Sequence, residues 1–169
     1  DNIQQMRHRI FIAINLPEDV KKKLADYQLK WPELPARWTK KENLHITLEF
    51  LGETTDEELL EILKNTKETA EKHKPFSVNF KKIIYGPLRG VPRMIWATGE
   101  KIKEFNFSPH ITLARLKTWE FNKMEPEEKP EINEEINLTF EVNSIEVMES
   151  DLKRGGPEYI ILESCPLKL

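Results

Sequence analysis

The sequence predicts an α+β fold with a mostly antiparallel sheet. Helical patterns occur mainly in the first half of the chain, whereas strand patterns continue to its end. Most connections between predicted strands are too short for parallel crossovers, which need a dozen or more residues. The 169 residues are enough for a substantial core, and a single domain spanning 1–169 is expected.

The first half of the chain alternates strands with helices. The run IFIAINL at 10–16 is apolar and β-branched, which predicts a buried strand. Pro17 suits the first turn of the helix that follows. A second strand is expected at about 44–51, ended by Gly52. The capping-box pattern TDEE from Thr55 then predicts the start of a second helix.

The second half is mostly strand. Residues 76–85 and 93–98 are a predicted hairpin around a turn rich in glycine and proline, and 107–116 is the next strand. A strand bent near its middle is expected at 136–148, and the last strand at 159–162. This order places no helix after the second predicted one.

The charge balance argues against a broad basic surface for wrapping duplex DNA or RNA, because the formal net charge is −3 at pH 7. Binding of one nucleotide or of an RNA end stays open, since it needs only a local positive pocket. The glutamate-rich segment 117–135 is expected to be an exposed, solvated loop.

Cysteine content and hydropathy favour a cytoplasmic location. The single Cys165 excludes an internal disulfide framework and a metal site made of several cysteines, and it is expected to be a packed thiol. No apolar run approaches the roughly 18 residues that span a bilayer. The N-terminal DNIQQMRHR lacks the apolar core of a signal peptide.

One motif, HITL, occurs twice, at 45–48 and 110–113. In a strand, residues two apart point to the same side. His45 and Thr47 therefore share one face of the first motif strand. His110 and Thr112 likewise share a face of the second. The repetition predicts two similar lobes, each giving one strand to a shared groove.

An imidazole and a hydroxyl on each strand suit displacement at phosphorus. Histidine titrates near neutrality, so one ring can take a proton while the other gives one. Each threonine hydroxyl can donate to a non-bridging phosphate oxygen. No metal and no cofactor is required by this set. The two rings should titrate as a coupled pair and give a bell-shaped pH profile.

Other interpretations of these residues were open. A single H-x-T in a strand is common and often structural. Two His and two Thr are a poor metal ligand set. Glu49 shares strand parity with His45, so it could orient the site or be solvated. The remaining histidines, His8 and His73, are expected at the surface.

The chain resembles the 2H phosphoesterase superfamily, named for such paired motifs. Within it, the resemblance is to the LigT-like RNA 2′,3′-cyclic phosphodiesterases, also called the 2′-5′ RNA ligase family. Four stretches carry it: RIFIAINLPEDVKKKL, ENLHITLEFLGE, FSPHITLAR and ESDLKRGGPEYIILESCPL. Together they cover most of the chain.

The resemblance implies a bilobal fold of two mostly antiparallel sheets around a central groove, with helices outside and pseudo-symmetric lobes. It implies metal-independent hydrolysis of a terminal 2′,3′-cyclic phosphate on RNA to a 2′-phosphate, by a monomer. Carried over, His45 is the general acid and His110 the general base, although the sequence is symmetric between them. Thr47 and Thr112 bind the phosphate. RNA ligase activity, or nucleotide binding without turnover, are the alternatives.

Arg115 matches the arginine that ends the second motif in the family and is a further candidate for phosphate binding. Strand parity places it opposite His110, so it could reach the site only past a strand end or a bulge. A structural salt bridge is the competing interpretation. Three aromatic residues are candidates for stacking on a base: Trp38, Phe50 and Tyr85. For each of them, packing in the core is the favoured interpretation.

One segment departs from the family pattern. A further helix is usual there between the hairpin and the second motif, but only 99–107 intervenes in this chain. Either the helix is lost, or a stretch is absent from the numbered chain.

Overall fold

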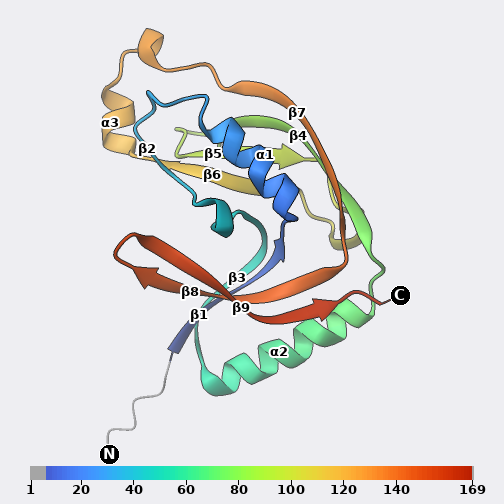
Figure 1. Ribbon diagram of the computed structural model, residues 1–169. Coiled ribbons are helices and arrows are strands. Elements are labelled where there is room, and N and C mark those ends of the chain that lie inside the picture. Colours follow the sequence, from blue (N-terminus) through green and yellow to red (C-terminus); the bar gives the residue numbers. More distant parts are fainter. Residues whose placement is uncertain (1–6, 169) are drawn as a thin grey trace, which may run out of the picture. The chain divides into compact units, whose positions relative to one another are not determined.

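The computed structural model describes residues 7–168 (Figure 1). The expectation that no signal peptide is present therefore falls largely outside the described residues. The chain divides into two compact units. The terminal unit comprises Asp1–Asn15, Thr47–Ser77 and Glu141–Leu169, and the central unit comprises Leu16–Ile46 and Val78–Phe140. No helix within 7–168 is long and apolar enough to cross a membrane.

The terminal unit is built on antiparallel strands with one long helix against them. β1 (Arg7–Asn15) pairs with β8 (Ser144–Lys153), and β8 pairs with β9 (Gly156–Pro166). α2 (Asp56–Glu71) runs along these strands and contacts all three (Figure 1). The single bent strand expected at 136–148 is in fact two strands, separated at Asn143.

α2 begins where its sequence signal predicts. The Thr55 hydroxyl accepts a hydrogen bond from the Glu58 backbone N–H, and the Glu58 carboxylate accepts one from the Thr55 N–H. The prediction that Gly52 ends the preceding strand is wrong, because β3 (His45–Thr55) runs through it. Gly52 has φ +76°, which a residue without a Cβ adopts at little cost, so the strand bends there without stopping.

The central unit holds the other strands and two helices. Its elements are α1 (Glu18–Gln28), β2 (Ala36–Trp38), β4 (Phe76–Gly86), β5 (Met94–Gly99), β6 (His110–Leu116), α3 (Thr118–Lys123) and β7 (Asn133–Val142). The strand order is β7-β4-β5-β6-β3, and β2 also pairs with β6. β1 pairs antiparallel with β8, β8 with β9, β4 with β5, and β6 with each of β2, β3 and β5. These pairings confirm the predicted α+β class with a mostly antiparallel sheet.

Two separate sheets are not confirmed. All nine strands belong to one connected path, β7-β4-β5-β6-β3-β1-β8-β9 with β2 on β6. The reason is β3, whose first residues pair in the central unit while its remaining residues belong to the terminal unit.

Two connectors differ from expectation. The expected loop 117–135 contains α3, in which Phe121 is buried against Tyr85 with ring centroids 5.5 Å apart. The short segment 99–107 contains one 3-10 turn, closed by a bridge between Ile102 and Phe107. It needs no helix to cross the sheet, because β5 and β6 are antiparallel neighbours.

Candidate functional site

The two motif strands are direct neighbours in the central unit. Ile46 of β3 lies opposite Ile111 of β6, and both side chains are fully buried. In an antiparallel pair, the residue before Ile46 faces the residue after Ile111. His45 and Thr112 are therefore cross-strand neighbours on the face opposite the isoleucines. Sequence parity predicted these faces, but not that the motifs would lie side by side.

The same face continues across β5. Thr98 lies opposite His110, and Trp96 lies opposite Thr112. The alternate residues Ile95 and Ala97 are fully buried on the other face. One side of this sheet is thus core, while the other presents half-buried polar and aromatic side chains.

A β-bulge brings Arg115 onto this face. Ile95 lies opposite Ala114, but the next residue, Trp96, lies opposite Thr112, so β6 holds one extra residue. Leu113 and Ala114 are consequently both buried in succession. Strand parity reverses at such a bulge. Arg115 therefore shares the face of Thr112, which resolves the parity objection raised by the sequence.

His45 is held by the turn that precedes β3. The 3-10 turn Lys41–Asn43 directs the Asn43 carbonyl to the ring, and Nδ1 of His45 donates to that oxygen at 2.6 Å. A carbonyl can only accept, so this bond assigns the proton to Nδ1 in the neutral ring. In that tautomer Nε2 is the ring nitrogen without a proton.

The pKa of His45 is lowered from its ordinary value. Burial is the main cause, and the Asn43 carbonyl opposes it. The positive charges of Lys21 and His110 lower the pKa further. Lys21 is a buried residue of α1, and its ammonium donates to the Glu42 carbonyl at 3.2 Å. The strand register places the two rings near each other, since His45 lies opposite Thr112 and His110 precedes Thr112 by two residues on the same face.

His110 is held by an aromatic stack. Its ring lies on Trp96 with centroids 4.1 Å apart and planes 22° from parallel. The indole in turn lies over Gly86 of β4, where a Cβ would meet a ring atom at 2.4 Å. Burial lowers the pKa of His110. The stack fixes the ring plane and removes one side of it from water.

The two motif threonines belong to different units of the structure. Thr112 lies within the central unit, and its carbonyl accepts a hydrogen bond from the Thr39 hydroxyl at 2.9 Å. Thr47 follows His45 by two residues on β3 and is half-buried, but it belongs to the part of β3 in the terminal unit. Its role toward phosphate stays a prediction.

Sequence reasoning missed Lys21, Trp96 and Asn43. A signal existed for Lys21, which lies beside Val20 on the buried stripe of α1 and so had to place its ammonium near polar atoms. Trp96 had only the alternation of β5, and Asn43 acts through its backbone. Neither Trp96 nor Asn43 is indicated by the composition of the sequence or by the spacing of its residues.

Several secondary predictions are settled by burial and contacts. Cys165 is buried, as expected. Trp38 stacks on Trp31 with centroids 6.5 Å apart, and Tyr85 packs on α3, so core packing is confirmed for both. Core packing is wrong for Phe50, which is 59% exposed. His8 is not a free surface residue either, because two carboxylates bind its ring.

Within the described residues, no group of three or more His, Cys, Asp or Glu side chains is arranged to hold a metal ion.

Comparison with known proteins places the chain among phosphoesterases. A protein-family model described as LigT like Phosphoesterase matches residues 14–96. A protein of Methanocaldococcus jannaschii named RNA 2′,3′-cyclic phosphodiesterase is 30% identical, covering 92% of this chain and 98% of the relative. One of the same name from Thermus thermophilus is 30% identical, covering 95% and 90%.

A solved structure agrees with these relatives. A crystal structure from Thermus thermophilus superimposes with a TM-score of 0.81 at 29% identity, covering 95% of this chain and 98% of the other. The match extends over nearly the whole chain.

Proposed function

Because the chain belongs to the LigT-like phosphoesterase family, and is therefore an enzyme, we propose that it hydrolyses the terminal 2′,3′-cyclic phosphate of RNA to a 2′-phosphate. The relatives at 30% identity are named for this activity. The observation that carries the proposal is the pairing of the two motif strands, which places His45 beside Thr112 and next to His110 in one unit.

The proposed reaction needs one proton removed and one supplied. One imidazole takes a proton from water as the water oxygen bonds to phosphorus. The other protonates the 3′-oxygen as the phosphorus–oxygen bond to it breaks. The products are a 2′-phosphate and a 3′-hydroxyl. In this scheme the two imidazoles carry out both proton transfers, and no metal or cofactor takes part.

Thr47, Thr112 and Arg115 are proposed to hold the phosphate oxygens. Hydroxyl and guanidinium donors aimed at an oxyanion stabilise the charge that it carries in the transition state. Arg115 is exposed and shares the face of Thr112, which supports its part. The proposed substrate is an RNA end or a nucleotide with a 2′,3′-cyclic phosphate, bound by a monomer in the cytoplasm.

We keep His45 as general acid and His110 as general base. Burial, and after it the charges of Lys21 and His110, lowers the pKa of His45 and favours its neutral form before substrate binds, which by itself suits a base. A bound phosphate dianion or monoanion opposes that effect by favouring the imidazolium. The assignment is therefore decided by experiment, through the pH profile described in the Discussion.

The activity is tested by hydrolysis of an oligonucleotide with a 2′,3′-cyclic phosphate in the presence of EDTA. The wild type should form the 2′-phosphate. His45→Ala and His110→Ala should each lose about 10²-fold or more in kcat, because each removes a proton-transfer partner. His73→Ala, which alters a histidine two residues after the end of α2, is the matched control. Full activity in either site variant would overturn the proposal.

A further inference from the structure

Arg37 lies on the same sheet face as the proposed site. β2 pairs antiparallel with β6, and in that register Arg37 lies directly opposite Arg115. Directly opposite residues point to the same side of a sheet. Trp38 and Ala114, one residue further on, both point to the other face, where Ala114 is fully buried. Two arginines thus leave the sheet from directly opposite positions, at the end of the face that carries Thr112.

Among residues 7–168, no carboxylate forms an ion pair with either arginine. Both arginines are exposed. Arg115 makes one weak contact, from Nη1 to the sulfur of Met94 at 3.9 Å. Like charges placed directly opposite each other destabilise a sheet. An anion bound between them would offset that cost.

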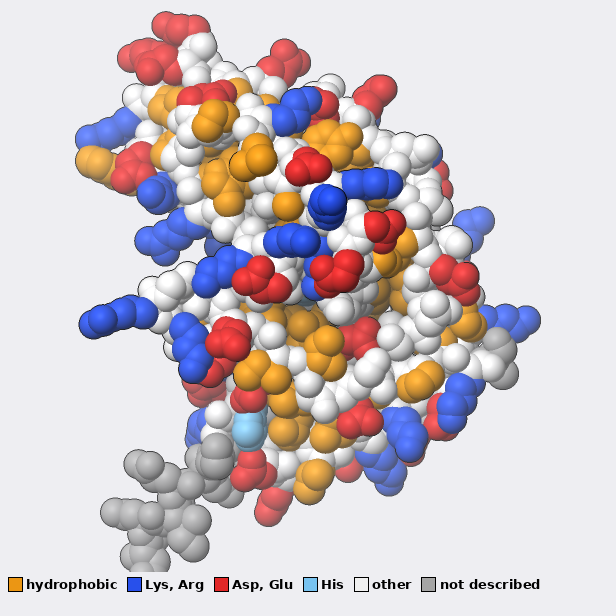
Figure 2. Space-filling model, viewed as in Figure 1, with side chains coloured by type: hydrophobic (Ala, Val, Ile, Leu, Met, Phe, Trp, Pro, Cys, Tyr) orange, Lys and Arg blue, Asp and Glu red, His pale blue; other side chains and the backbone are white. Residues whose placement is uncertain are grey.

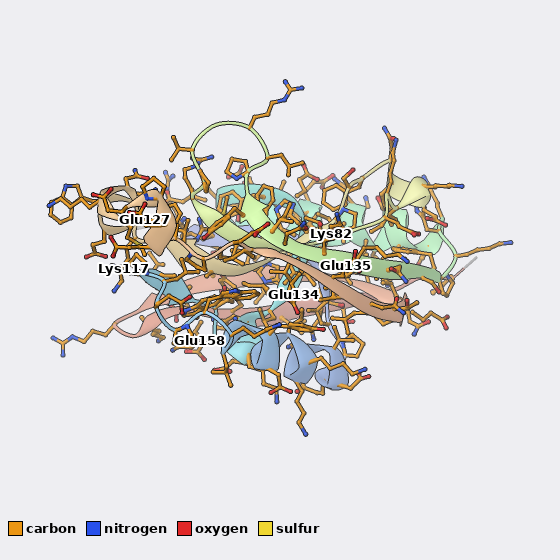
Figure 3. All side chains as sticks on the ribbon, turned by 90° about the horizontal axis from the view of Figure 1, so that it is seen from above. Lys82, Lys117, Glu127, Glu134, Glu135 and Glu158 are labelled. Atoms are coloured by element: carbon orange, nitrogen blue, oxygen red, sulfur yellow. The ribbon has the colours of Figure 1, made fainter. Side chains whose placement is uncertain are left out.

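Some cations elsewhere in the central unit form an ion pair with a carboxylate. Glu134 of β7 binds the Lys30 ammonium at 2.5 Å. Its neighbour Glu135 points to the opposite face of β7, which pairs with β4, the strand of Lys82 (both residues are labelled in Figure 3). Acidic and basic side chains also intermix over the face drawn in Figure 2.

We propose that Arg37, placed opposite Arg115, forms a subsite for the RNA phosphate on the 5′ side of the terminal nucleoside. This inference rests on the proposed function. An RNA that ends in a cyclic phosphate continues only in the 5′ direction, so its next phosphate is that one. Arg115 lies three residues from Thr112 along β6, about 10 Å between Cα atoms. Flexible arginine side chains span the remainder, and their forked donors match a phosphate.

The subsite is tested by equilibrium binding, which needs no turnover. Calorimetry compares adenosine 2′-monophosphate with adenosine 2′,5′-bisphosphate, which differ only in the 5′-phosphate. The wild type should bind the bisphosphate at least about tenfold more tightly, as expected for charge-assisted hydrogen bonds. Arg37→Met should abolish most of that preference. Arg37→Lys should keep part of it, because it retains the charge but not the fork.

Lys23→Met is the matched control, since it removes an exposed cation from α1 and should leave the preference unchanged. Absence of a preference in the wild type would overturn the subsite. So would an Arg37→Met variant that keeps the wild-type preference. A protein that is inactive in the EDTA assay but shows an Arg37-dependent preference would overturn only the proposed function.

Discussion

The two histidines differ in what surrounds their rings. His45 has a carbonyl on Nδ1 and a lysine ammonium near enough to lower its pKa. The ring of His110 lies on the indole of Trp96, and burial lowers its pKa. The two motifs are identical in sequence, but the surroundings of their histidine rings differ. That asymmetry makes the roles of the two rings separable by experiment.

Replacing Lys21 should separate them. Lys21→Met removes a positive charge near His45, so the pKa of His45 should rise toward its ordinary value. If His45 is the acid, the alkaline limb of the kcat/KM profile should move to higher pH. If His45 is the base, the acid limb should move instead. NMR titration of the His45 ring should show the same rise.

Lys21→Arg is the control for this prediction, because it keeps the charge near the ring. Its profile should stay close to that of the wild type. A Lys21→Met variant whose His45 titrates as in the wild type would show that the ammonium does not act on the ring.

At the level of elements, local signals and tertiary pairing made separate contributions. α2 starts at its capping box because that signal involves residues three apart in the chain. β6 contains a bulge that no local sequence pattern predicted. This bulge places Arg115 on the same face as Thr112. The start of a helix can thus be predicted from the sequence. The face to which a strand residue points cannot always be predicted, because a bulge reverses it.

The cap of α2 should have a measurable effect on stability. Thr55→Ala removes the side-chain acceptor for the Glu58 N–H and should lower the free energy of unfolding by about 1 kcal/mol. Thr55→Ser keeps the hydroxyl and should recover most of it. Urea unfolding measures both. Lys64→Ala, at an exposed position in the middle of α2, should change little. A Thr55→Ala variant as stable as the wild type would contradict this role.

At the scale of the whole molecule, His8 joins segments that are far apart in the chain. Its Nδ1 contacts Glu149 of β8 at 2.6 Å, and its Nε2 contacts Asp56, the first residue of α2, at 2.7 Å. Hydrogen bonds to Asp56 and then Glu149 raise the pKa of His8 above its ordinary 6.5. Both contacts are strongest when the ring is protonated and donates from both nitrogens.

Stability should therefore depend on pH through His8. A raised folded-state pKa gives a contribution that is complete below the unfolded pKa of about 6.5 and is lost as pH rises through the folded value. His45 and His110 have lowered pKa values, so their effect is confined to pH below about 6.5. Urea unfolding from pH 6.5 upward should show a decline in the wild type that His8→Gln lacks. Equal slopes in both proteins would refute the link.

The sequence by itself determined the secondary-structure class, the start of α2, the buried first strand and the chemistry available to the doubled motif. Each of these depends on residues close together in the chain, whose period, caps and side-chain types act locally. The tertiary structure decided that β3 and β6 pair, that the bulge turns Arg115 to the site, and that Lys21, Trp96 and Arg37 lie around it. Those relations join residues far apart in the chain, so they exist only once the strands have paired.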